Sequence, residues 1–188
     1  MILIFRRDID NIGTDSLDCQ LNFFPEQADM NTPESVLSVV FDTNICLDFF
    51  IFHDPVSCRL LNYLRTGNLL AVTRTDCREE FLTVLDYPKL ELSENDKEQA
   101  VACFDRFITV IDAETKKRDF LPVCTDPDDQ KFLETAFDAN AKFLFTKDKA
   151  LLKLARHNRK RGLFRIISPA QWLIEMKQEI PEDPISSC

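Results

Sequence analysis

The stretch "VVFDTNICLDFF", residues 39–50, decides the fold prediction for this chain. Its apolar start is typical of a buried strand, which ends on Asp42 and is followed by Thr43, Asn44 and an amphipathic segment. A carboxylate at the end of a buried strand needs a partner, because burying an unpaired charge is costly. We therefore ask which other side chains can reach Asp42 beyond this strand.

Strand-like and helix-like segments alternate along the rest of the chain. The pattern predicts strands at 36–41, 69–72, 142–146 and 164–167, with "FITVI" at 107–111 as a fifth candidate, and helices at 44–52, 56–66, 75–86, 93–107, 126–140, 149–158 and 169–178. Such alternation favours right-handed crossovers and a parallel sheet covered on both faces. The fold class predicted is α/β: a three-layer α/β/α sandwich with a central, mainly parallel sheet of four to five strands.

The domain organisation predicted from the sequence has three parts. A chain of 188 residues with 45% apolar content suits one domain with a sizeable core. Residues 1–34 are polar and show no helical period, so we expect an N-terminal extension of uncertain role. We expect the compact domain at 35–177 and a C-terminal tail at 178–188.

Composition excludes several classes of protein. Three glycines leave no phosphate-binding loop and no dinucleotide fingerprint, and no GxSxG motif supports a serine hydrolase. The two histidines, His53 and His157, argue against histidine-based hydrolases. Seven cysteines without a CxxC pair favour a reduced cytoplasmic protein. No apolar run reaches the roughly 18 residues that a membrane span needs, so we expect a soluble protein.

Acidic residues follow two of the predicted strands. Asp42 ends the first strand, while Thr146 ends the strand at 142–146 and is followed by Asp148. Functional groups in parallel sheets gather beyond the carboxyl ends of the strands, near the point where the strand order reverses. We therefore expect these residues to lie at the same sheet edge. Asp148 has a second interpretation, as the N-cap of the next helix.

Two further acids lie on predicted helices. Asp129 precedes Phe132 and Leu133 by three and four residues, which puts it on the apolar face of its helix. The helix dipole explains the neighbouring acids of that first turn adequately, but it does not require a buried position. Glu80 borders the apolar face of the helix at 75–86 and Glu79 points further out, although Glu80 is also interpretable as a solvated helix residue. Asn44 is equally interpretable as a helix cap, and Asp48 is expected to face solvent.

Together these acids predict a metal site. Several carboxylates in one pocket repel each other unless cations neutralise them. Oxygen ligands without histidine or cysteine favour hard ions, Mg²⁺ or Mn²⁺. Such a site suits phosphodiester cleavage by metal-activated water.

A basic stretch stands out in this acidic chain. Residues 147–165 carry a net charge of +7, whereas the whole chain carries −9. The stretch is either a solvated helix face or a patch that binds RNA phosphates or a partner. Its candidate binding residues are Lys147, Lys149, Lys153, Arg156, Arg159, Lys160 and Arg161.

The sequence resembles the PIN-domain family, in particular bacterial toxin components of toxin–antitoxin pairs (VapC-like ribonucleases). The matching pieces are "VVFDTN", "REEFLTVLDYPKL", "TDPDDQKFLETAFDANAKFLFTKDKALLKL" and "FRIISPAQWL", within residues 36–174. The resemblance implies that four acids bind the metal and carry catalysis, while three polar residues support them. The metal-binding acids are Asp42, Glu80, Asp129 and Asp148, and the supporting residues are Asn44, Thr146 and Asp126. It also implies a cognate antitoxin and a homodimer.

The function expected is a metal-dependent endoribonuclease, the toxin of a toxin–antitoxin pair, that hydrolyses single-stranded RNA with Mg²⁺ or Mn²⁺. Two alternatives stay open. One is a haloacid-dehalogenase-like phosphatase with Asp42 as nucleophile, although that family has an aspartate where this chain has Asn44. The other is a catalytically idle module of the same fold that binds RNA or protein. The RNA target, the preferred metal and the oligomeric state are not encoded in any motif.

Overall fold

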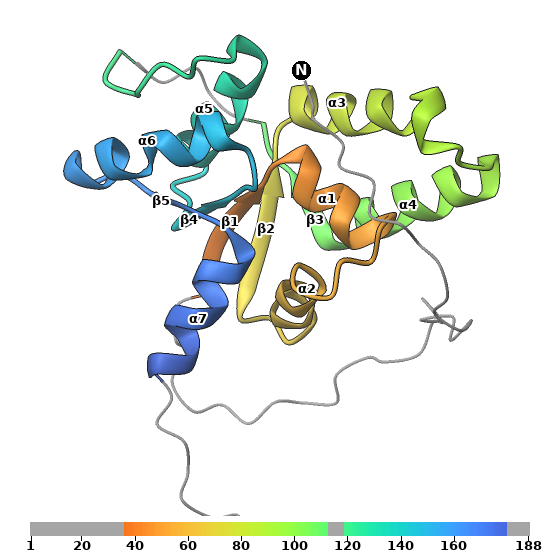
Figure 1. Ribbon diagram of the computed structural model, residues 1–188, viewed down its shortest axis with the longest axis horizontal. Helices are drawn as coiled ribbons and strands as arrows, with labels where there is room; N and C mark the ends of the chain where they lie inside the picture. The colour runs from red at the N-terminus through yellow and green to blue at the C-terminus, as the bar shows by residue number, and fades with distance from the viewer. Residues whose placement is uncertain (1–35, 113–118, 180–188) are drawn as a thin grey trace, which may run out of the picture. The chain divides into compact units, whose positions relative to one another are not determined.

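The computed structural model describes residues 36–112 and 119–179. Its centre is a five-stranded sheet in the order β3-β2-β1-β4-β5, in which all neighbouring strands are parallel (Figure 1). The strands are β1 (Leu37–Phe41), β2 (Leu69–Thr73), β3 (Ile108–Val110), β4 (Phe143–Phe145) and β5 (Arg165–Ile167). Along the chain, β2 and then β3 extend the sheet on one side of β1, and β4 and then β5 extend it on the other side. The strand order reverses between β1 and β4.

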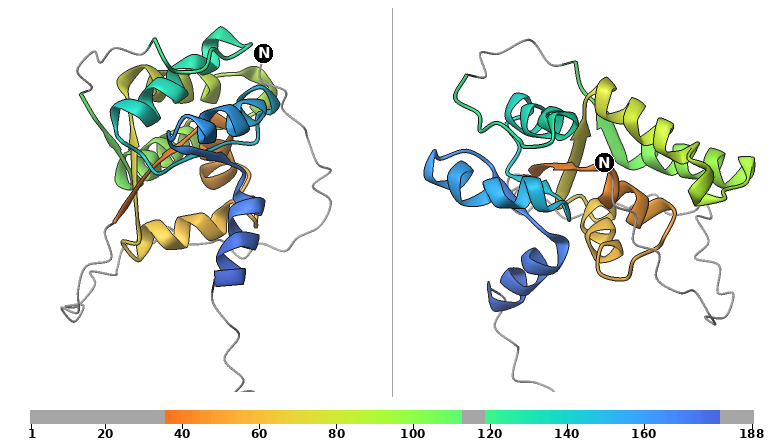
Figure 2. Two further views of the ribbon diagram at one scale, coloured as in Figure 1. Left: turned by 90° about the vertical axis from the view of Figure 1, so that its left-hand side faces the viewer. Right: turned by 45° about the horizontal axis from the view of Figure 1, so that its top comes forward.

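Helices connect the strands and cover the sheet. They are α1 (Thr43–Phe50), α2 (Cys58–Arg65), α3 (Thr75–Leu85), α4 (Glu94–Phe107), α5 (Gln130–Asp138), α6 (Lys149–Lys160) and α7 (Pro169–Glu179), with short 3₁₀ turns η1 (Pro88–Leu90) and η2 (Pro127–Asp129). Helices α3 and α4 run beside each other in the right-hand view of Figure 2, and they are joined by the stacked rings of Phe81 and Phe104 and by the ion pair between Arg78 and Asp105.

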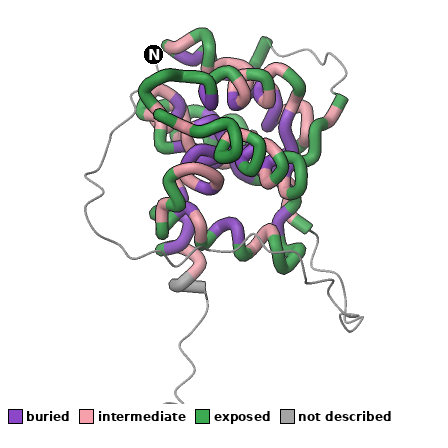
Figure 3. Tube along the Cα trace, turned by 90° about the vertical axis from the view of Figure 1, so that its right-hand side faces the viewer, coloured by how far each residue is buried: buried purple, intermediate pink, exposed green. Residues whose placement is uncertain are grey.

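The alternation of side chains along each strand divides the core into two layers. On one face, Phe41 and its register partner Phe145 pack with Phe49 of α1 and Trp172 of α7. On the other face, Val40, Leu144 and Ile166 join the cluster that α5 and α6 bury. Burial is concentrated where the helices meet the sheet, as the purple segments of Figure 3 show. These layers form the three-layer sandwich that the sequence predicts.

The predicted elements agree closely with the observed ones. Each predicted strand and helix is present, including β3 as the fifth strand, and a capping box of Ser93 and Asp96 opens α4. Two local details differ. A 3₁₀ turn follows Pro88, and the helix predicted from residue 126 begins as the 3₁₀ turn η2 before α5.

Two of the predicted segments lie wholly or mostly outside the residues that the structure describes. The predicted extension at 1–34 and almost all of the predicted tail lie outside the described residues. Within the part that is described, no helix has both the length and the apolar content needed to cross a membrane.

Candidate active site

Asp42 occupies the carboxyl end of β1, next to the point where the strand order reverses. Its N–H donates to the Phe145 carbonyl of β4 (3.1 Å), so the sheet pairing continues to this residue. Its side chain is buried, and both carboxylate oxygens accept hydrogen bonds: Oδ1 from the Ile45 N–H (2.9 Å) and Oδ2 from the Thr146 hydroxyl. Asp42 is the N-cap of α1, which excludes the interpretation of Asn44 as the cap. Asn44 lies half-buried in the first turn.

The environment of Asp42 disfavours its negative charge. Burial is the largest effect and raises the pKa of Asp42 to about 7, and the charges of Asp129 and Asp48 act in the same direction. The hydrogen bonds from Thr146 and Ile45 lower the pKa but do not compensate. A cation beside the carboxylate would favour its charged form.

Thr146 connects Asp42 to Asp148. The buried Thr146 hydroxyl donates to Asp42 and accepts from the Asp148 N–H (2.9 Å). The Asp148 side chain caps α6 through one oxygen, because Oδ1 accepts from the N–H groups of both Ala150 (2.6 Å) and Leu151 (3.1 Å). The capping interpretation of Asp148 is therefore correct, and it uses only Oδ1. The Thr146 hydroxyl therefore contacts the carboxylate of Asp42 and the backbone of Asp148.

Asp129 approaches the same region from α5. It stands at the N-cap position of α5 but makes no capping hydrogen bond, and its side chain is half-buried. Burial raises the pKa of Asp129 to about 6, assisted by the charges of Asp148, Asp126 and Glu80. The Asp126 side chain instead accepts from the Asp128 N–H (3.1 Å) and caps η2. Asp129 is thus near enough to the other acids to feel their charge, and it is not used as a cap.

Glu80 faces inward from α3, whereas Glu79 is exposed. Its Oε1 accepts from the Thr43 hydroxyl (2.5 Å), and its Oε2 forms an ion pair with Lys131 of α5. Sequence reasoning missed Lys131, because a lysine in a polar first turn is usually solvated. The solvated-helix interpretation of Glu80 is wrong, since its side chain is only 16% exposed and both oxygens have partners.

A second network surrounds the loop between β4 and α6. Asp48 accepts from the Ser57 hydroxyl (2.7 Å) and forms an ion pair with Lys147 (2.5 Å), which also approaches Asp54 (3.5 Å). The expectation that Asp48 faces solvent is wrong, because only 13% of its side chain is exposed. Lys147 therefore holds its loop against α1, and the position of neighbouring Thr146 and Asp148 depends partly on this contact.

The other basic candidates lie on or just beyond α6. Lys149, Lys153, Arg156 and Lys160 are exposed and spaced to share one face of the helix. We call this row the α6 stripe. Arg159 and Arg161 are exposed beside its end, and Arg161 donates to the Phe120 carbonyl.

The chemistry of these residues fits a hard divalent cation. Within residues 36–112 and 119–179, no three histidine, cysteine, aspartate or glutamate side chains already form a group able to hold a metal ion. The donors are nonetheless carboxylate oxygens. Burial is the main cause of the raised pKa of Asp129, and repulsion by neighbouring acids, which a shared cation would relieve, adds to it. Lys131 and Thr43 hold the two oxygens of Glu80, so this carboxylate would have to leave both partners before it could bind a cation.

Comparison with known protein families gives a match over more than half of the chain. The model of the PIN domain matches residues 38–150. The chain belongs to the PIN-domain family. No curated protein matches the sequence. PIN domains are generally nucleases, and the match spans β1 to the start of α6, including all the candidate acids of this PIN domain.

Proposed function

We propose that this PIN domain is a metal-dependent endoribonuclease that hydrolyses single-stranded RNA. The observation that carries the proposal is the Thr146 hydroxyl, which donates to the Asp42 carboxylate and accepts from the backbone N–H of Asp148 at the point where the strand order reverses. Ligands bind α/β sheets at such points, and two oriented carboxylates there suit a divalent cation.

The proposed site assigns a role to each acid. Asp42, Asp129 and Asp148 would hold Mg²⁺ or Mn²⁺, with Glu80 completing the acidic set. A cation held there would supply a water of lowered pKa and would stabilise negative charge on the phosphate oxygens. Thr146 orients Asp42, and the α1 N–H of Ile45 fixes its other oxygen. Addition of water across the phosphodiester then leaves a 5′-phosphate and a 3′-hydroxyl.

Metal removal tests the proposal directly. Purified full-length chain is expected to cleave unstructured RNA with Mn²⁺ and to lose roughly 100-fold or more of that rate in excess chelator, because the acids alone cannot activate water. A 5′-phosphate-dependent exonuclease should degrade the downstream product. Cleavage that persists in chelator, or products with cyclic 2′,3′-phosphates, would contradict the mechanism.

The α6 stripe supports RNA as the substrate. It begins one residue after Asp148 and follows α6 away from the sheet edge for roughly 17 Å (Figure 1). Its lysines and arginine form no ion pair with any described residue. Unpaired positive charges in a row that starts at the site are suited to phosphates of a single strand.

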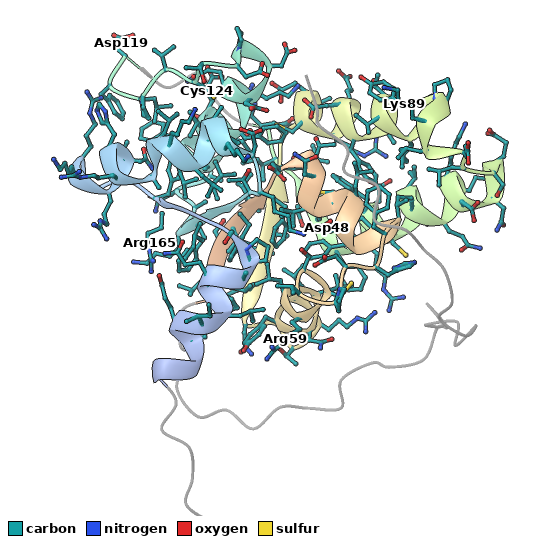
Figure 4. All side chains as sticks on the ribbon, in the orientation of Figure 1. Asp48, Arg59, Lys89, Asp119, Cys124 and Arg165 are labelled. Atoms are coloured by element: carbon teal, nitrogen blue, oxygen red, sulfur yellow. The ribbon has the colours of Figure 1, made fainter. Side chains whose placement is uncertain are left out.

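Removing two charges from the α6 stripe should weaken RNA binding and its salt dependence. For Lys153→Gln/Arg156→Gln we expect roughly tenfold weaker binding and a slope of log affinity against log salt that is shallower by about 1.4. Fluorescence anisotropy with a labelled oligoribonucleotide in chelator measures both quantities. Arg59→Gln/Lys89→Gln removes the same charge from exposed positions far from α6 (Figure 4) and should change little. Equal losses in the two variants would indicate only a net-charge effect.

The toxin role, a cognate antitoxin and a homodimer are further parts of the proposal, supported by the resemblance to bacterial toxin components. Induction of the wild-type chain in growing cells should stop growth, whereas the Asp42→Asn variant should not.

The phosphatase alternative has no supporting feature, because both Asp42 oxygens accept hydrogen bonds and residue 44 is asparagine. An idle module would be distinguished by failing to bind Mn²⁺ through its carboxylates.

A further inference from the structure

Lys131 is a basic side chain within the acidic site. Its ammonium contacts Glu80 Oε2, while the Thr43 hydroxyl donates to Glu80 Oε1 at 2.5 Å. The exposed fractions of the two side chains are 23% for Lys131 and 16% for Glu80. Both oxygens of Glu80 are therefore already occupied by groups of the protein.

The surroundings of Lys131 and Glu80 favour their ion pair. The Lys131 ammonium and the Glu80 carboxylate are in direct contact, and both side chains are largely shielded from water, so solvent and salt screen their attraction little. Lys131 also lies 5.8 Å from the centre of the Phe132 ring, which favours a positive charge there. Lys131 is thus a charged and well-held side chain, which would have to be displaced before Glu80 could turn to a metal ion.

The remaining acids differ from Glu80 in this respect. In the described part of the chain, no salt bridge joins a basic side chain to Asp42, Asp129 or Asp148. The site therefore combines one neutralised carboxylate with three that lack a basic partner there.

From this asymmetry we infer that Lys131 is a positioning residue that withholds Glu80 from the metal, so that a divalent cation binds through Asp42, Asp129 and Asp148. The inference rests on the proposed metal site and refines it: Glu80 contributes to metal binding only when Lys131 is removed.

Metal binding in four variants of the full chain tests this inference without measuring activity. Isothermal titration with Mn²⁺ gives the Kd for wild type, Lys131→Met, Glu80→Gln and the double variant. We expect Lys131→Met to lower the Kd at least fivefold, because the freed Glu80 becomes a ligand. In the Glu80→Gln background the same lysine change should alter the Kd less than twofold. Lys131→Arg, which keeps the charge, should stay within twofold of wild type.

Comparing the effect of Lys131→Met in the wild-type and the Glu80→Gln backgrounds distinguishes the release of Glu80 as a metal ligand from a long-range effect of the lost charge. An equal gain in both backgrounds would show that Lys131 acts only through its charge, and no gain would show that Glu80 is not withheld; either result overturns the inference. Lys89→Met, at an exposed position on η1, is the matched control. If Lys131→Met does not fold, as judged by circular dichroism in chelator, Lys131→Gln takes its place with the same expectation.

The failure of the inference can be distinguished from the failure of the proposed function. If wild-type chain binds no Mn²⁺, or Asp148→Asn does not weaken binding, the metal site itself is wrong and the inference falls with it. If binding is intact and depends on Asp148, but Lys131→Met has no Glu80-dependent effect, only the role of Lys131 is wrong.

Discussion

Replacement of Asp42 by asparagine is expected to lower the rate of RNA cleavage by roughly 10²–10³-fold or more. The amide preserves the size of the side chain and can still accept the Ile45 hydrogen bond, so α1 keeps its cap. It loses the negative charge that would bind the cation, and it changes the partner of the Thr146 hydroxyl that also positions Asp148. Initial rates on a generic single-stranded RNA with Mn²⁺ measure the effect.

A matched substitution controls for a general loss of acidic charge. Asp128 is exposed in η2, next to Asp129, and Asp128→Asn should retain cleavage within about twofold. Undiminished cleavage by Asp42→Asn would refute the assignment of the site. Equal losses in both variants would show that the acidic surface as a whole, rather than Asp42, affects the RNA.

The same Asp42→Asn substitution is expected to stabilise the metal-free protein at neutral and alkaline pH. Burial raises the pKa of Asp42 from 3.8 to about 7, so the folded state binds a proton that the unfolded chain releases. The contribution of this group to stability is fully present below pH 4 and is lost as the pH rises through about 7. Above pH 7 the charged carboxylate costs on the order of 1–4 kcal/mol, which asparagine removes.

Denaturant unfolding in chelator at pH 5 and pH 8 measures this effect. The free energy of unfolding of Asp42→Asn should exceed that of wild type by more at pH 8 than at pH 5, while Asp128→Asn should follow wild type at both. Mn²⁺ should stabilise wild type and leave Asp42→Asn nearly unchanged, because only the wild-type site binds it. A variant that is less stable than wild type at pH 8 in chelator would show that the buried charge of Asp42 is compensated.

Local sequence patterns correctly predicted the helices and strands, because the residues that define each element lie within or next to it in the sequence. Apolar runs, proline positions and capping residues lie within a few residues of the element that they define, as Ser93 and Asp96 do for α4. The position of Asp42 after β1 and of Asp148 after β4 follows directly from such boundaries. Helical spacing also indicated correctly that Glu80 rather than Glu79 faces inward.

Predictions failed where a side chain depends on a partner distant in sequence. Asp48 was expected to face solvent because its helix position suggests exposure, but Lys147 and Ser57 bury it. Lys131 gave no sequence signal, since its role exists only beside Glu80 of another helix. Both cases involve charged groups whose preferred surroundings change once a partner is present.

The sequence by itself determined the alternation of strands and helices and the placement of acids at strand ends, because periodicity and capping act over short distances. Only the tertiary structure decided that β1 and β4 are neighbours, and with this that Thr146 donates to Asp42 across 104 positions of the chain. Parallel pairing fixes which strand ends meet, and no local pattern encodes that choice. The same packing gives the Glu80 carboxylate a counter-ion, Lys131. It also buries Asp42, and this burial raises the pKa of Asp42 and disfavours its charged form.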